Sequence, residues 1–202
     1  KGERIDGNKF ISEALKNKSS LAIVNKISKN CTAAKQVKVK NTLSFLTKCS
    51  SIFRENTNAK IISITGSCGK TTLKEMIGLT LKSISKTSYS PKSFNNRYGV
   101  PLSLFNLKQN DKFGVFEVGM DKKGEIDNLT KIIKPDLGVI TNISYAHAKN
   151  FKNINKIAEA KAEIMNNIKK GGSVLLNKDD SFYSYHKNFA YKKKLKVISF
   201  GI

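Results

Sequence analysis

"KIISITGSCGKTTLKEMI", from Lys60 to Ile77, joins three local patterns in one order. An apolar run predicts a buried strand, a glycine-containing turn ends in Gly-Lys-Thr, and an amphipathic pattern predicts a helix. A glycine turn between a strand and a helix is typical of loops that bind phosphate groups. The usual loop would have its first glycine at position 64, where this sequence has Ile64. The stretch therefore predicts phosphate binding by a variant of that loop.

The alternation of strand and helix patterns continues to the end of the sequence. The expected strands are 61–65, 113–119, 136–142, 173–177 and 196–200, and the expected helices begin at Thr71 and cover 124–134 and 155–168. Continuous apolar strands separated by helices indicate an α/β fold, with a mostly parallel sheet covered by helices on both faces. Ligands of such sheets bind at the carboxyl ends of the strands, so we expect the functional residues there.

The segment before this region predicts part of a small α/β domain. Residues 8–18 and 41–56 have helix patterns, and residues 21–24 form an apolar run typical of a strand. A polar stretch, ENTNA, follows the second helix, and we place a domain boundary there. The expected organisation is a partial N-terminal domain, residues 1–57, and a central P-loop domain, residues 58–202.

The charge of the chain bears on its partners. The 202 residues carry a net charge of +22, which is compatible with nucleic-acid binding, but arginine occurs only at Arg4, Arg54 and Arg97 and the lysines are spread along the chain. Proteins that read bases and phosphates favour arginine for its bidentate geometry. We therefore interpret the charge as a solvated, lysine-rich surface and expect no nucleic-acid partner.

Other features of the composition bear on location. No run approaches the roughly 18 apolar residues of a membrane span and no signal peptide opens the sequence, so we expect no membrane insertion and a cytoplasmic location. The spacing of Cys31, Cys49 and Cys68 favours reduced thiols over a disulfide framework or a zinc cluster. Because the sequence begins with Lys1 rather than Met, we expect a fragment of a longer protein. We also expect the protein to be a monomer.

The glycine turn predicts how a nucleotide would be held. Gly66 and Gly69 allow backbone N–H groups to approach a phosphate, and the positive end of the following helix points at it. Lys70 adds a point charge. Thr71 or Thr72 would offer a hydroxyl group to Mg²⁺.

Two polar residues follow later strands of the expected sheet. Glu117 ends an apolar strand, where it is either a surface-facing terminus or a metal ligand that faces the phosphates. His147 lies in the loop after a neighbouring strand and is either an ordinary loop histidine or a ligand at the same edge of the sheet. His186 has no such neighbours, and we assign it no function.

Lys161 interrupts the apolar face of the last long helix. That face consists of Ile154, Ile157, Ala158, Ile164, Met165 and Ile168. An unpaired ammonium group is costly to bury. Lys161 therefore either loses its proton or gains a partner, or it extends along the helix edge to reach solvent.

Taken together, these segments resemble the Mur ligase family, the ATP-dependent amide-bond ligases of peptidoglycan precursor assembly, to which folylpolyglutamate synthase is related. The family loop has the form TGxxGKT and lacks the first glycine of the usual pattern, as "TGSCGKTT" does here. Further similar segments are "FNNRYGVPLSLFNL", "EVGMDKKGEIDNLTKIIKPDLGVITNISYAH", "EAKAEI" and "LLNKDD", and less specifically "GERIDGNKF". All of these further segments are similar to the member that joins D-alanyl-D-alanine to a UDP-N-acetylmuramoyl-tripeptide.

The resemblance implies roles for individual residues. ATP would be bound by Gly66, Ser67, Cys68, Gly69, Lys70, Thr71 and Thr72, with Asn95 or Asn96 near the nucleotide. Thr71 and Glu117 would bind one Mg²⁺, and His147 with Glu117 a second. Lys161 would be carbamylated and face the metal, and Lys70 and His147 would also be catalytic. The enzymes transfer the γ-phosphoryl group of ATP to a carboxylate, and an amine attacks the acyl phosphate.

Three positions depart from the family pattern, and two other functions stay open. Cys68 and Asp121 each stand where asparagine is usual, and Lys149 stands where a glutamate would follow the histidine. Cys68 should have little effect, because that loop acts through its backbone. The alternatives are a related ligase that adds a different amino acid, folylpolyglutamate synthase included, and a basic P-loop ATPase that binds nucleic acid.

Overall fold

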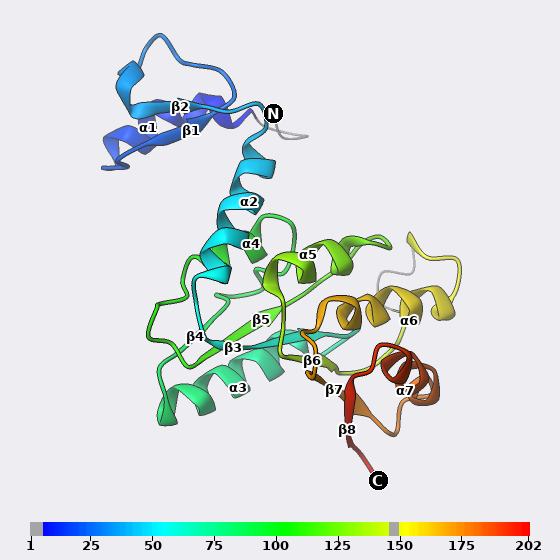
Figure 1. Ribbon diagram of the computed structural model, residues 1–202. Helices are drawn as coiled ribbons and strands as arrows, with labels where there is room; N and C mark the ends of the chain where they lie inside the picture. The colour runs from blue at the N-terminus through cyan, green and yellow to red at the C-terminus, as the bar shows by residue number, and fades with distance from the viewer. Residues whose placement is uncertain (1–5, 146–149) are drawn as a thin grey trace. The chain divides into compact units, whose positions relative to one another are not determined.

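The computed structural model describes residues 6–145 and 150–202 (Figure 1). The chain divides into two compact units, Lys1–Lys48 and Cys49–Ile202. The sequence placed a boundary later, after residue 57. The division falls within a helix, α2 (Thr42–Glu55), because the end of that helix is bonded into the second unit: buried Arg54 donates to the carbonyl oxygen of Ile133 at 2.8 Å.

The first unit is a small α/β structure built on two short strands. Its elements are η1 (Gly7–Phe10), α1 (Ile11–Lys16), β1 (Ala22–Val24), η2 (Ala33–Lys35), β2 (Gln36–Lys38) and the start of α2. Strands β1 and β2 pair in parallel. The buried Gln36 side chain holds the loop between them, since it accepts from the backbone N–H of Ser28 and donates to the carbonyl oxygen of Cys31.

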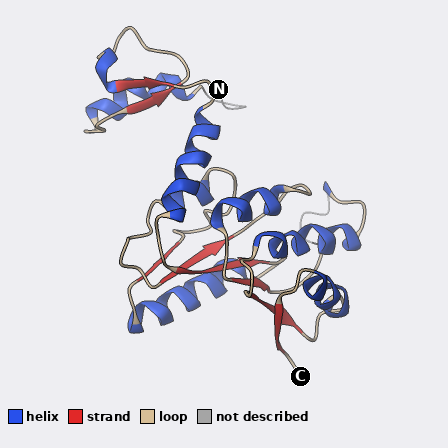
Figure 2. Ribbon diagram, in the orientation of Figure 1, coloured by secondary structure: helices blue, strands red, loops and turns tan. Residues whose placement is uncertain are grey.

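The second unit contains a six-stranded sheet, and all of its pairings are parallel (Figure 2). The strands are β3 (Lys60–Thr65), β4 (Thr87–Tyr89), β5 (Phe113–Glu117), β6 (Leu137–Ile140), β7 (Ser173–Asn177) and β8 (Lys196–Phe200), in the order β4-β5-β3-β6-β7-β8. The predicted α/β fold with a mostly parallel sheet is confirmed. Central β3 lies between β5 and β6, so the carboxyl ends of these three strands meet at one edge.

Helices cover the two faces of this sheet unequally. They are α3 (Lys70–Ile84), α4 (Gly99–Leu104), α5 (Glu125–Ile133), α6 (Ile154–Ala162) with the 3₁₀ turn η4 (Glu163–Asn167), and α7 (Tyr183–Lys192). Helix α3 packs against Ile64, Val115 and Val139 on one face. The larger core on the other face includes residues of α4, α5, α6 and α7, and Figure 1 shows α5 and α6 across the sheet from α3.

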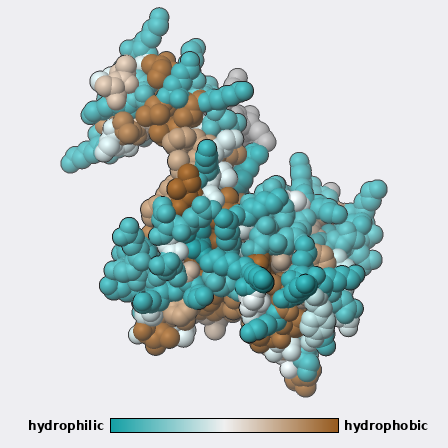
Figure 3. Space-filling model, in the orientation of Figure 1, coloured by the Kyte–Doolittle hydropathy of each residue, from teal (hydrophilic) through white to brown (hydrophobic). Residues whose placement is uncertain are grey.

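The sequence patterns predicted most of this unit but missed β4, α4 and α7. The predicted helix 155–168 is also two elements, α6 followed by η4. The view in Figure 3 shows mostly hydrophilic residues, as a lysine-rich sequence predicts. In the part of the chain that the structure describes, no helix is both long and apolar enough to cross a bilayer.

Candidate functional site

The predicted phosphate loop connects β3 to α3 at the carboxyl edge of the sheet. Gly66 has a φ of +147° and Gly69, which precedes the helix, a φ of +78°, and both values favour glycine. The first backbone N–H groups of an α-helix have no partner within it and carry the positive end of its dipole. The first turn of α3 therefore offers donors for a phosphate.

The loop after β6 holds the phosphate loop in place. The carbonyl oxygen of Asn142 accepts from the N–H of Ser67 at 2.9 Å, and its side-chain oxygen accepts from the N–H of Cys68 at 3.0 Å. The Thr141 hydroxyl donates to the carbonyl oxygen of Cys68 at 2.7 Å. The Ser67 hydroxyl also bonds to Ser144. Since the N–H groups of Ser67 and Cys68 are already bonded, phosphate donors remain at the start of α3.

Thr141 also explains why residue 66 is glycine. A Cβ atom at Gly66 would lie 1.8 Å from the hydroxyl oxygen of Thr141. The sequence patterns predicted a strand over residues 136–142 and so placed Thr141 and Asn142 at its end, whereas β6 ends at Ile140. No short-range pattern indicates that Thr141 and Asn142 bond to a loop more than seventy residues earlier.

Lys70 is folded back onto its own loop. Its ammonium group donates to the carbonyl oxygens of Gly66 at 2.9 Å and Ser67 at 3.2 Å. These two carbonyl oxygens belong to the loop that would surround a bound phosphate. A rotation of the Lys70 side chain would therefore bring its charge from the loop to a bound phosphate.

Glu117 lies at the end of β5 beside this loop. It is only 1% exposed, so it is not a surface-facing strand terminus. One carboxylate oxygen accepts from the Thr71 hydroxyl and the other from the side-chain amide of Asn95, both at 2.7 Å. Thr72 is exposed. The structure thus brings Thr71, Asn95 and Glu117 together at the mouth of the loop.

The two adjacent asparagines have different environments. Asn95 bonds to Glu117, whereas the side-chain oxygen of Asn96 accepts from the N–H groups of Tyr98 and Gly99 at the start of α4. Asn96 therefore orders the backbone that enters this helix, and Asn95 is the one that reaches the site.

The donor set at Glu117 fits Mg²⁺. This ion prefers oxygen ligands and is usually bound through one or two carboxylates together with substrate phosphates. The Glu117 carboxylate and the Thr71 hydroxyl supply such oxygens. No group of three or more His, Cys, Asp or Glu side chains within 6–145 and 150–202 could hold a metal by itself. His147 and Lys149 lie outside the described residues.

Lys161 is buried in α6, with 2% of its surface exposed. Its side chain does not extend along the helix edge to solvent. Burial, and next the positive charge of Lys70, lower the Lys161 pKa to about 7, although Cys68 opposes the shift. A large fraction of the Lys161 amine is therefore neutral and nucleophilic at and above neutral pH.

The remaining sequence candidates lie around or outside this site. Cys68 is an exposed, free thiol in the phosphate loop. Asp121 is exposed after β5, and its N–H donates to the Glu125 side chain at the start of α5. His186 is buried in α7, where its ring Nε2 contacts the carbonyl oxygen of Ala158 at 3.1 Å.

Known proteins have sequences similar to this one. The UDP-N-acetylmuramoyl-tripeptide–D-alanyl-D-alanine ligase of Buchnera aphidicola subsp. Baizongia pistaciae is 36% identical over 204 residues, which cover 100% of this chain and 43% of that protein. The ligase of the same name from Buchnera aphidicola subsp. Acyrthosiphon pisum is 37% identical over 202 residues, 96% of this chain and 44% of that protein. The chain thus spans less than half the length of these relatives.

Solved structures agree with these relatives. MurF from Acinetobacter baumannii superposes with a TM-score of 0.90 at 34% identity, covering 100% of this chain and 44% of that one. MurF ligase from Thermotoga maritima in complex with ADP gives a TM-score of 0.85 at 30% identity, covering 100% and 46%. Residues 64–202, which include the phosphate loop from Gly66 onward, Glu117 and Lys161, match the Mur ligase middle domain. The chain belongs to the Mur ligase family.

Proposed function

We propose that this chain is the ATP-binding part of a ligase that adds D-alanyl-D-alanine to UDP-N-acetylmuramoyl-tripeptide. The relatives and the structure that match 96–100% of the chain at 34–37% identity support this function by their names. We further propose that residues 1–57 are part of the domain that binds the UDP substrate, that residues 58–202 are the central ATP-binding domain, and that the enzyme is a cytoplasmic monomer.

The observation that carries the proposal is the bonding of Glu117 at the mouth of the phosphate loop. Its two oxygens are aligned by Thr71 and Asn95, each at 2.7 Å. We assign Glu117 and Thr71 as ligands of one Mg²⁺, and Glu117 with His147 as ligands of a second. When bound, Mg²⁺ supplies neutralisation of charge on the phosphate oxygens.

The other residues of the loop act on the nucleotide directly. The N–H groups at the start of α3 bind the phosphates. Lys70 exchanges the carbonyl oxygens of Gly66 and Ser67 for the γ-phosphate and stabilises the charge that develops during its transfer to the substrate carboxylate. Binding of both substrates at one site aligns the carboxylate with the phosphoryl group and the amine with the acyl phosphate.

We also propose that Lys161 is carbamylated. Its neutral amine can add to CO₂ with loss of one proton, which gives a negatively charged carbamate. This group replaces a buried ammonium by oxygen atoms of the kind that Mg²⁺ prefers. The burial of Lys161 and its lowered pKa support this assignment.

Calorimetric titration of the 202-residue chain with Mg-ATP tests the proposal. We expect weak binding by the wild-type chain, loss of binding in Lys70→Ala with the fold retained, and no change in Lys82→Ala, an exposed lysine later on the same helix. Binding that survives Lys70→Ala would contradict the assignment of the loop.

A ligation assay tests the substrates. In the full-length enzyme, UDP-N-acetylmuramoyl-tripeptide and D-alanyl-D-alanine should stimulate ATP hydrolysis and give an amide product. Stimulation by another amino acid, or by glutamate with a folate, would favour a related ligase. Stimulation by a polynucleotide would instead favour a nucleic-acid-binding ATPase.

A further inference from the structure

Lys74 is a buried charge that the proposed chemistry does not use. It lies one turn after Lys70 on α3, and its side chain has no exposed surface. The sequence pattern of the helix does not indicate that the Lys74 side chain is buried. A buried ammonium group is retained at a cost unless every donor is paired.

The Lys74 ammonium group makes two hydrogen bonds and one ion pair. The group donates to the carbonyl oxygen of Ser90 at 2.7 Å and to that of Lys92 at 2.5 Å, and it pairs with the Glu75 carboxylate at 2.7 Å. Two backbone carbonyl oxygens and one carboxylate therefore compensate the burial of the ammonium group. Two of these partners belong to the segment that follows β4.

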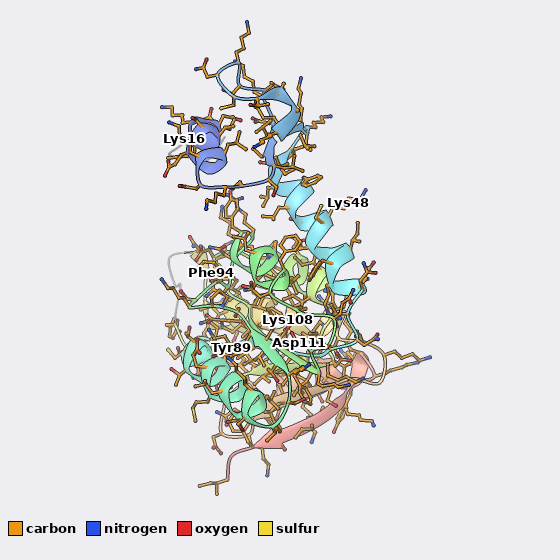
Figure 4. The ribbon with its side chains drawn as sticks, turned by 90° about the vertical axis from the view of Figure 1, so that its left-hand side faces the viewer. Lys16, Lys48, Tyr89, Phe94, Lys108 and Asp111 are labelled. Carbon is orange, nitrogen blue, oxygen red and sulfur yellow. The ribbon has the colours of Figure 1, made fainter. Side chains whose placement is uncertain are left out.

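That segment has an unusual backbone where Lys74 contacts it. Lys92 has a φ of +48°, a left-handed conformation that is uncommon for residues other than glycine and asparagine. Such a conformation persists only where the surrounding structure maintains it. Figure 4 labels Tyr89, which comes directly before this segment, and Phe94, which lies within it.

The same segment bonds to Glu117 at two points. The N–H of Glu117 donates to the Ser90 hydroxyl at 3.3 Å, and the Asn95 side chain donates to the Glu117 carboxylate. The backbone of Asn95 is fixed as well, because its carbonyl oxygen accepts from the N–H of Gly119 at 2.8 Å. Gly119 leaves room for Asn95, since a Cβ atom there would lie 2.9 Å from the Asn95 side chain.

We propose that Lys74 is a positioning residue, which fixes the segment from Ser90 to Asn95 so that Asn95 orients the Glu117 carboxylate toward the metal that accompanies the nucleotide. Lys74 itself touches neither phosphate nor metal. The inference rests on the proposed ATP site for its consequence in binding, but the ordering of the segment can be measured without any ligand.

Hydrogen exchange of the chain without ligand tests the ordering. Lys74→Met removes the ammonium group and keeps an unbranched side chain, and Lys82→Met makes the same change at an exposed position of α3. We expect the N–H groups of Glu117 and Gly119 to exchange about tenfold faster in Lys74→Met, with the N–H groups of β6 unchanged. Unchanged exchange at Glu117 and Gly119 would overturn the proposal.

Nucleotide titrations test the consequence for metal binding. ADP is titrated in EDTA and again in Mg²⁺, and the ratio of the two dissociation constants measures the contribution of the metal. We expect Lys74→Met to reduce that ratio about tenfold while binding in EDTA stays as in the wild type. A general loss of stability would weaken binding under both conditions, and an unchanged ratio would overturn the proposal.

A double-mutant cycle tests whether Lys74 acts through Asn95. Asn95→Ala should reproduce the effect of Lys74→Met on the ratio, and the two changes together should cost no more than either alone. Additive effects would show that Lys74 acts by another route.

If the wild-type chain binds no nucleotide, the proposed function fails, while the exchange experiment still decides the role of Lys74. If Lys74→Met does not fold, Lys74→Gln replaces it, and unfolding of both would assign Lys74 to the stability of the whole unit and overturn the proposal.

Discussion

Gly66 is a position where one methyl group decides the shape of the phosphate loop. In Gly66→Ala the new Cβ would overlap the Thr141 hydroxyl, so the bond from Thr141 to Cys68 must break. We expect about 1–3 kcal/mol of lost stability and no detectable nucleotide binding. Urea denaturation and calorimetry measure the two effects.

Gly69 provides the control for that substitution. A Cβ atom at Gly69 meets nothing within 4 Å, so Gly69→Ala costs only the left-handed backbone conformation, about 1–2 kcal/mol. Thr141→Ala should also relieve the overlap in Gly66→Ala and recover part of the binding. Full binding by Gly66→Ala alone would show that the loop does not need contact with Thr141.

Lys161 should react with CO₂ near neutral pH. The amine becomes neutral as the pH rises through its pKa of about 7, rather than through the ordinary value of 10.5, so carbamate should form increasingly between pH 6 and 8. Nuclear magnetic resonance with ¹³CO₂ should give a carbamate signal in the wild-type chain that is absent in Lys161→Met. Lys156→Met, an exposed lysine on the same helix, is the control. A signal that persists in Lys161→Met would place the carbamate elsewhere.

At the scale of elements, the contact between α6 and α7 should depend on pH. His186 of α7 is buried against the carbonyl oxygen of Ala158 in α6, and burial lowers the His186 pKa below its usual value of 6.5. The unfolded chain then binds a proton more readily than the folded one, so this stability is present above about pH 6.5 and is lost as the pH falls through the folded pKa. His186→Gln keeps a donor and should flatten the change in urea midpoint between pH 5 and 7.5.

Burial is the largest cause of the lowered His186 pKa, and two nearby charges modify it. Asp180 raises the His186 pKa and Lys161 lowers it. Substituting Lys187, which is on α7 but stacks on Tyr183 and Tyr191, should leave the pH dependence as in the wild type. An equal pH dependence in the wild type and in His186→Gln would show that His186 does not cause the pH dependence.

Elements with strong local patterns could be predicted from the sequence, and others could not. Strand β3 and helix α3 are long, periodic and joined by a glycine turn. Strand β4 has three residues, and α4 begins with Gly-Val-Pro, so both depend on tertiary packing more than on local preference.

The residues of the site also fall into those that the sequence predicts and those that it does not. The phosphate loop is one continuous motif, and the sequence located it. The bond from Asn142 to this loop joins residues that are far apart in the chain. Lys74, which bonds to the segment after β4, has the sequence pattern of an ordinary surface lysine. Hydrophobic periodicity carries no information about such pairs, because it reports which face of an element is buried and not which polar atoms meet there.

At the scale of the larger unit, Arg54 should be a main contributor to stability. It is 2% exposed and donates to the carbonyl oxygens of Ile133, Lys134 and Thr57. In Arg54→Met these buried acceptors lose their donor, and we expect about 2–3 kcal/mol of lost stability. Lys48→Met, an exposed lysine of α2, should change the urea midpoint little. Equal midpoints for the two variants would contradict this role.

The strand order of the sheet also governs how the protein can form during synthesis. Strand β3 is made first but pairs only with β5 and β6, and β4 pairs only with β5. No strand of this sheet can pair until β5, which begins at residue 113, has left the ribosome. The apolar β3 therefore stays unpaired while the residues before β5 are translated. The phosphate loop gains its bonds to Thr141 and Asn142 later still, because these residues follow β6. The nucleotide site is therefore completed late in the folding of this unit, and the unpaired β3 is open to aggregation until β5 has formed.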